Sequence, residues 1–173
     1  MCRLKQFVLW LLVLACASAL ATSQVTAAER RARAYLPAVQ RQPPSYAAQV
    51  ITLVNRERTS RGIPALTAHP CLTAAAQGHT VDMATTGNIS HTGSDGSSAG
   101  DRIREAGYQP STWGECIAAG YPTPADVVAG WMNSSGHREI LLSRSYVHIG
   151  VGYVRLDGPG PTHYWTVNVA SPS

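Results

Sequence analysis

The stretch VHIGVGYVRLDGPGPTHYWTVNVA, residues 147–170, contains two apolar runs separated by a turn rich in glycine and proline. Apolar side chains occupy every second position of both runs, which is the period of a β-strand. They are Val147, Ile149, Val151 and Tyr153 in the first run and Trp165, Val167 and Val169 in the second. The intervening turn, LDGPGP, predicts that the two strands pair antiparallel as a hairpin. Gly150 and Gly152 within a strand indicate close packing of another backbone.

Helices and one further strand are expected ahead of this hairpin. Apolar positions with helical spacing predict a helix around Ala47 to Val54, ended by Gly62, and a second helix from Pro70 to near Gly87. His79 lies on the apolar side of the second helix and is expected to be a core histidine. A short helix at 101–106, a strand at 113–120 (WGECIAAG) and a helix ending near Asn133 follow. Helices before and between antiparallel strands predict an α+β fold.

The first 21 residues have the features of a secretory signal peptide. Arg3 and Lys5 precede an apolar run from Phe7 to Ala15, and a small-residue cleavage site ends at Ala21. The run is too short for a comfortable membrane span. We therefore expect a secreted, extracellular protein without a transmembrane span in the mature chain. A lipoprotein anchored at Cys16 is the alternative.

The net positive charge of the chain comes from residues outside the expected globular part. The chain has 14 Lys and Arg residues against 10 acids, a net charge of +4. Residues 22–44 are rich in Pro, Gln and Ala and contain four arginines, which is typical of a flexible linker. Residues 45–173 contain 8 arginines, no lysine and 9 acids. This segment is long enough for one domain, and its charge argues against nucleic acid as a partner.

Two of the four cysteines, Cys71 and Cys116, remain once the leader is removed. Two thiols in an oxidising compartment favour a disulfide, which the loop-entropy model values at about 4 kcal/mol at most. We therefore predict a Cys71–Cys116 disulfide, with two buried free thiols as the alternative. No cysteine or histidine spacing indicates a structural zinc site.

Eight fragments of residues 48–170 resemble one known family in both order and spacing. They are VNRERTSRGIPAL, CLTAAAQGHTVDMA, ISH, DRIREAGY, WGECIAAG, WMNSSGHREILL, HIGVGYV and YWTVNVA. Together they resemble the CAP superfamily of cysteine-rich secretory proteins, antigen 5 and pathogenesis-related proteins, in its bacterial SCP-like branch. Residues 45–173 are thus expected to form a CAP/SCP-like domain.

The resemblance implies a three-layer α-β-α sandwich with a central antiparallel sheet. It also implies a shallow cleft where two histidines and two acids meet, and which in several members holds a divalent metal. Carried over position by position, it places His91, Glu115 and His137 in this cleft. A divalent cation such as zinc is therefore the expected cofactor, since three protein ligands suffice for an open zinc site.

Two positions depart from the family pattern. Ser134 lies three residues after Trp131, where animal and fungal members have the second acid, and Cys116 replaces the usual asparagine. With one carboxylate missing, only weak cation binding is expected.

The sequence favours binding over catalysis. It shows no serine or cysteine nucleophile in a recognisable turn and no glycine-rich phosphate loop, so no catalytic residue is assigned. The resemblance implies a binding module for a small lipid-like or cell-envelope ligand. The alternative is a metal-dependent hydrolase, a protease or esterase, that uses the same cleft. A purely structural surface domain is the third possibility.

Overall fold

The computed structural model describes residues 45–157 and 160–173, so the expected signal peptide (1–21) and linker (22–44) lie outside the described residues. The elements are α2 (Tyr46–Thr59), β1 (Thr67–Ala68), α3 (Pro70–Thr86), α4 (Ala99–Glu105), β2 (Pro110–Ala119), α5 (Pro124–Asn133), α6 (Ser135–Leu142), β3 (His148–Arg155) and β4 (His163–Pro172).

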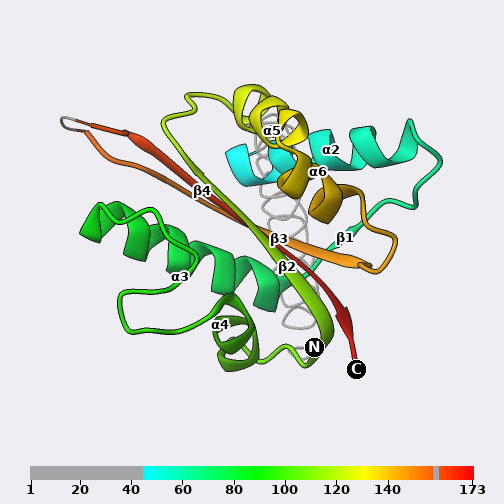
Figure 1. The fold of residues 1–173 in the computed structure, drawn as a ribbon, viewed down its shortest axis with the longest axis horizontal. Coiled ribbons are helices and arrows are strands. Elements are labelled where there is room, and N and C mark those ends of the chain that lie inside the picture. Colours follow the sequence, from blue (N-terminus) through cyan, green and yellow to red (C-terminus); the bar gives the residue numbers. More distant parts are fainter. Residues whose placement is uncertain (1–44, 158–159) are drawn as a thin grey trace, which may run out of the picture. The chain divides into compact units, whose positions relative to one another are not determined.

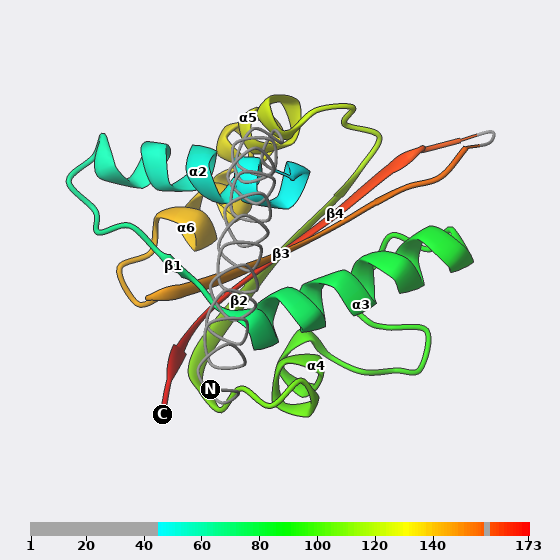
Figure 2. The same ribbon diagram turned by 180° about the vertical axis from the view of Figure 1, so that it is seen from behind.

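The strands form one sheet in the order β1-β3-β4-β2. β4 pairs antiparallel with both β2 and β3, which confirms the predicted hairpin. Helices α2, α5 and α6 cover one face of the sheet, and α3 and α4 cover the other (Figures 1 and 2). The α+β class and the α-β-α layering are therefore confirmed. The sheet also has one strand that the sequence did not reveal, β1, which pairs parallel with β3 over two residues.

The central strand, β4, is buried on both faces. Trp165, Val167 and Val169 belong to the larger apolar core, on the side of α2, α5 and α6. Thr166 and Asn168, which alternate with them, are equally buried, and Thr166 accepts a hydrogen bond from the Thr80 hydroxyl of α3 (2.9 Å). The face of the sheet under α3 therefore carries polar side chains within the core.

Helix α3 begins and ends as the sequence predicted. Pro70 occupies its first turn, where a missing N–H costs nothing, and His69 caps the helix by accepting from the Cys71 N–H (3.3 Å). Gly87 ends it in the left-handed conformation, with a φ of 70°. Between these ends α3 lies directly on β3, because Gly150 and Gly152 have no side chains to separate the two backbones. The expected close packing at these glycines is confirmed.

The predicted Cys71–Cys116 disulfide is wrong, because both cysteines are free thiols. Cys71 packs with the small apolar cluster between α3 and α4, whereas Cys116 is buried in the large core on the opposite face of the sheet. A disulfide needs Cα atoms within about 7 Å, and the sheet separates these two side chains. The alternative of two free thiols is the one observed.

We expect Cys116 to resist thiol reagents in the native protein. Burial raises the pKa of its thiol to about 12, so that the reactive thiolate is scarce at neutral pH. Titration with a thiol reagent after denaturation should find two reactive groups at positions 71 and 116, and before denaturation none at Cys116. No free thiol in the denatured mature chain would show that the disulfide forms after all.

Candidate functional site

The loop after α3 brings His91 over the sheet. Its fold depends on Asp82 of α3, whose carboxylate accepts from both the backbone N–H and the hydroxyl of Ser94. The Ser94 side chain and then its backbone N–H lower the pKa of Asp82. Asp95 in turn accepts from the Ser97 N–H (2.9 Å). The local turn chemistry of serine and aspartate therefore shapes the loop that presents His91.

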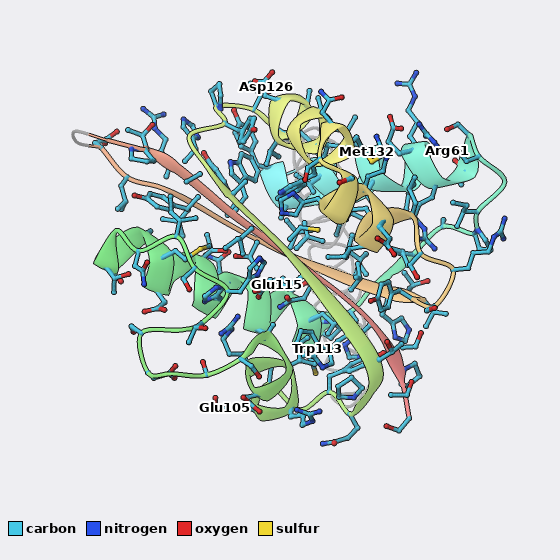
Figure 3. All side chains as sticks on the ribbon, in the orientation of Figure 1. Arg61, Glu105, Trp113, Glu115, Asp126 and Met132 are labelled. Carbon is cyan, nitrogen blue, oxygen red and sulfur yellow. The ribbon has the colours of Figure 1, made fainter. Side chains whose placement is uncertain are left out.

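Glu115 is the centre of the site. It lies midway along β2, and Figure 3 shows it between the two helical layers. Its side chain is only 2% exposed, yet it is surrounded by hydrogen-bond donors. Oε1 accepts from Nδ1 of His91 (2.9 Å), and Oε2 accepts from Nη2 of Arg102 (2.8 Å). The Asn168 amide, oriented as its hydrogen bonds require, donates to Oε2 (3.2 Å). A buried carboxylate is stable here because each oxygen is paired.

Arg102 connects the loop to this carboxylate. It lies on α4, which starts with a capping box between Ser98 and Asp101. Besides Glu115, its guanidinium donates to the carbonyl of Ser97 (2.8 Å) and to the carbonyl of His91 (3.1 Å). One side chain therefore neutralises Glu115 and fixes the backbone of the loop that carries His91.

His79 lies beneath Glu115 and was predicted to be a core histidine, which is confirmed. Its side chain is 1% exposed, and Nε2 lies 2.8 Å from the Ser90 carbonyl and 4.0 Å from Oε1 of Glu115. Because a carbonyl only accepts, Nε2 bears the proton and Nδ1 is the bare nitrogen. Burial lowers the pKa of His79, although the neighbouring Glu115 opposes this shift. His79 is thus a neutral support for the site.

His137 lies near the pair without bonding to it. It belongs to the first turn of α6, and its backbone carbonyl lies 3.9 Å from Sγ of Cys116, the neighbour of Glu115. Burial lowers the pKa of His137, and the neighbouring His91 adds to that shift. The structure thus joins His91 directly to Glu115 and leaves His137 close by. Ser134 lies at the junction of α5 and α6 and lines a separate hollow with Tyr121 and Gly130.

A cleft of about 440 Å³ opens beside the His91–Glu115 pair. Its apolar side is formed by Trp113, Ile140 and Tyr146, and its polar side by His91, Thr92 and Ser98. Trp113 is 39% exposed, and Figure 3 shows it on the same strand as Glu115. Tyr146 packs against β2 at Gly114 and donates from its hydroxyl to the Trp113 carbonyl (3.1 Å). The cleft therefore combines an aromatic wall with a polar rim.

The hydrogen bonds around Glu115 leave no room for a metal ion bound to its carboxylate. Both carboxylate oxygens already accept hydrogen bonds, one of them from a guanidinium. Within residues 45–157 and 160–173, no group of three or more His, Cys, Asp or Glu side chains is placed to hold a metal. The cation expected from the resemblance remains a prediction.

Sequence reasoning found two members of this network and missed two. His91 and Glu115 were expected together, and they are. Arg102 lies in the short helix expected at 101–106 but was not expected to reach Glu115, and Asn168 was not singled out. Neither has a local signature, since only the fold brings α4 and β4 to Glu115.

This fold, with an exposed histidine bonded to a buried glutamate, defines an SCP-type α-β-α domain. The chain belongs to the CAP family, described as the cysteine-rich secretory protein family, whose model matches residues 51–169.

Two Bacillus subtilis (strain 168) proteins are similar in sequence. The uncharacterized protein YkwD is 37% identical over 110 residues, covering 64% of this chain and 43% of YkwD. The uncharacterized membrane protein YlbC is 36% identical over 107 residues, covering 62% of this chain and 31% of YlbC. The chain thus matches less than half the length of either relative.

Two solved structures are similar in fold. An extracellular protein containing an SCP domain, from Bacillus anthracis str. Ames, has a TM-score of 0.65 at 29% identity, with 72% of this chain and 40% of that chain covered. An outer surface protein from Borrelia burgdorferi has a TM-score of 0.63 at 21% identity, with 72% of this chain and 90% of that chain covered, and shows the fold alone.

The buried histidines predict a loss of stability in mild acid. The pKa values of His79 and His137 are lowered on folding, so the unfolded chain takes up protons first as the pH falls below about 6.5. Stability is then lost at up to about 1.4 kcal/mol per pH unit for each proton. Urea unfolding at about pH 7.5 and about pH 5.5 should show this loss, and His79→Gln should reduce it. An equal loss in both proteins would contradict this role for His79.

Proposed function

We propose that this protein is an exported binding module that takes a lipid-like, amphipathic ligand of the cell envelope into the cleft beside Glu115. The observation that carries the proposal is Trp113, a large aromatic side chain left 39% exposed on the wall of a cleft. Aromatic side chains bury a large apolar area when a ligand covers them. The polar rim at His91, Thr92 and Ser98 supplies partners for a headgroup.

Export is part of this proposal. It is supported by the expected leader at residues 1–21 and by the similar Bacillus anthracis protein, which is described as extracellular. Among the helices of residues 45–157 and 160–173, none has the length and apolar character needed to cross a membrane. Intact-mass analysis of the exported chain should find a start at Thr22, whereas a lipid-modified start at Cys16 would establish the lipoprotein alternative.

Binding should depend on Trp113. We expect laurate, a single-chain amphipath, to bind in calorimetric titration, and Trp113→Ala to weaken this binding by roughly tenfold or more, because one aromatic contact is lost. Tyr121→Ala is the matched control, because Tyr121 is 37% exposed but lies outside this cleft. Equal affinities of the parent and Trp113→Ala, or binding of an uncharged envelope disaccharide in preference to laurate, would contradict the proposal.

A hydrolase remains the second candidate because of one contact. Glu115 accepts from Nδ1 of His91, which leaves Nε2 of this half-exposed imidazole as a bare nitrogen able to act as a general base. We nevertheless expect no fast ester or peptide hydrolysis, with or without added Zn²⁺. Turnover of a p-nitrophenyl ester that disappears in His91→Ala would promote this candidate over the binding module.

A further inference from the structure

We infer that the guanidinium of Arg102 takes the place of a metal ion in this cleft, so that the site is held together by an internal cation. The inference goes beyond the proposed function and does not depend on which ligand the cleft binds. It starts from the position of Arg102, whose side chain is 10% exposed and 2.8 Å from Oε2 of Glu115.

The carboxylate of Glu115 has no free oxygen to offer a metal ion. His91 bonds to one oxygen, and Arg102 together with Asn168 bonds to the other. The carboxylate is 2% exposed, so that a hydrated ion reaches it only if one of these donors leaves. A dication would also have to approach a carboxylate whose charge a buried guanidinium already balances, and like charges repel strongly where water is excluded.

The charges in the cleft balance without a metal ion. Two acids and a dication are neutral together, and one acid and one guanidinium are neutral as well. This chain has Ser134 where the second acid is expected, and Ser134 lines a different hollow from that of His91 and Glu115. The one buried carboxylate of this cleft is therefore already balanced by the one buried guanidinium, and no second acid at position 134 is present to balance a dication.

Arg102 also holds the residues of the cleft in position, as a bound ion would. Its bonds to the carbonyls of Ser97 and His91 hold the loop at both ends of the segment that forms the polar rim. Glu115 in turn orients the His91 ring, as carboxylates do for metal-bound histidines. With Glu115 occupied, the predicted ligand set is reduced to His91 and His137, fewer than the three protein ligands of an open zinc site. Arg102 is thus a positioning residue.

The test is calorimetric titration of chelator-treated protein with Zn²⁺, repeated with Co²⁺ to record its visible absorption. The parent should show no binding that depends on His91, whereas Arg102→Met should bind Zn²⁺ about tenfold or more tightly than the parent, with loss of binding when His91→Ala is added. Arg104→Met is the matched control, because Arg104 is on the same helix but 51% exposed and 3.6 Å from Asp101. Arg102→Gln, which keeps a donor to Glu115, serves if Arg102→Met does not fold.

Two results would overturn the inference. One is binding of Zn²⁺ by the parent that His91→Ala abolishes. The other is a folded Arg102→Met protein, or the Arg102→Gln protein where Arg102→Met does not fold, that binds Zn²⁺ no better than the Arg104→Met control. Should both arginine variants unfold, the parent titration decides the matter alone, since the inference requires the parent cleft to be free of metal.

Discussion

Replacing Gly150 with alanine is expected to lower the free energy of unfolding by about 3 kcal/mol or more, because it overpacks a contact between two backbones. A Cβ at this position would collide with the backbone of Leu72 and Thr73 at the start of α3. A flexible side chain could turn away from such a clash, but a helix backbone cannot. Urea unfolding of the parent and Gly150→Ala, with far-ultraviolet circular dichroism as the signal, measures the difference.

Gly78→Ala is the matched control for this experiment. Gly78 lies in the same helix, and nothing is within 4 Å of the position where its Cβ would be. Because alanine favours the helix interior over glycine, this variant should be about 0.5–1 kcal/mol more stable than the parent. A Gly150→Ala protein within about 0.5 kcal/mol of the parent would contradict the close packing of α3 on β3.

Replacing Arg102 with methionine is the second change with a large expected effect. It leaves the carboxylate of Glu115 buried without its ionic partner, which costs about 3–5 kcal/mol. The double variant Arg102→Met with Glu115→Gln removes the unpaired charge and should recover part of that loss. Both can be compared with the parent by urea unfolding in chelator-treated buffer.

Comparing the single and double variants shows whether the lost stability comes from the unpaired Glu115 carboxylate or from a general loss of packing. If the double variant is no more stable than Arg102→Met alone, the cost does not come from the unpaired carboxylate. Arg104→Met should differ little from the parent, because its ion pair with Asp101 is exposed and screened by water.

The sequence predicts the elements well where a local pattern governs them. The hairpin follows from alternation around a glycine- and proline-rich turn, and the ends of α3 follow from Pro70 and Gly87. Strand β1 has no such pattern, since two exposed residues pair with β3 only because the chain passes beside it. Tertiary contact alone determines an element of this kind.

The disulfide prediction was wrong because the number of cysteines says nothing about the direction in which their side chains point. Successive residues of a strand point to opposite faces, so that Cys116 must point away from the face that receives Glu115. Glu115 faces α3, where Cys71 lies, and Cys116 therefore faces the other helices. This alternation was available in the sequence once Glu115 was placed.

Only part of the hydrogen-bond network around Glu115 could be predicted, because the rest depends on which elements the fold brings together. The resemblance placed His91 and Glu115 beside each other, as the structure does, and Ser134 already showed that the second acid is missing. Arg102 lies at the start of a short helix in the sequence, and nothing in its neighbourhood there indicates a contact with Glu115. Its role depends on the distance between α4 and β2, which only the fold determines.

The central claim is that the cleft beside Glu115 binds an amphipathic ligand without a metal. An amide NMR titration of chelator-treated, isotope-labelled protein with laurate tests it most directly. We predict that the shifted resonances cluster at the polar rim, at His91, Thr92 and Ser98, and along the wall at Trp113, Gly114 and Tyr146. Shifts that cluster elsewhere, or that appear only after Zn²⁺ is added, would contradict it.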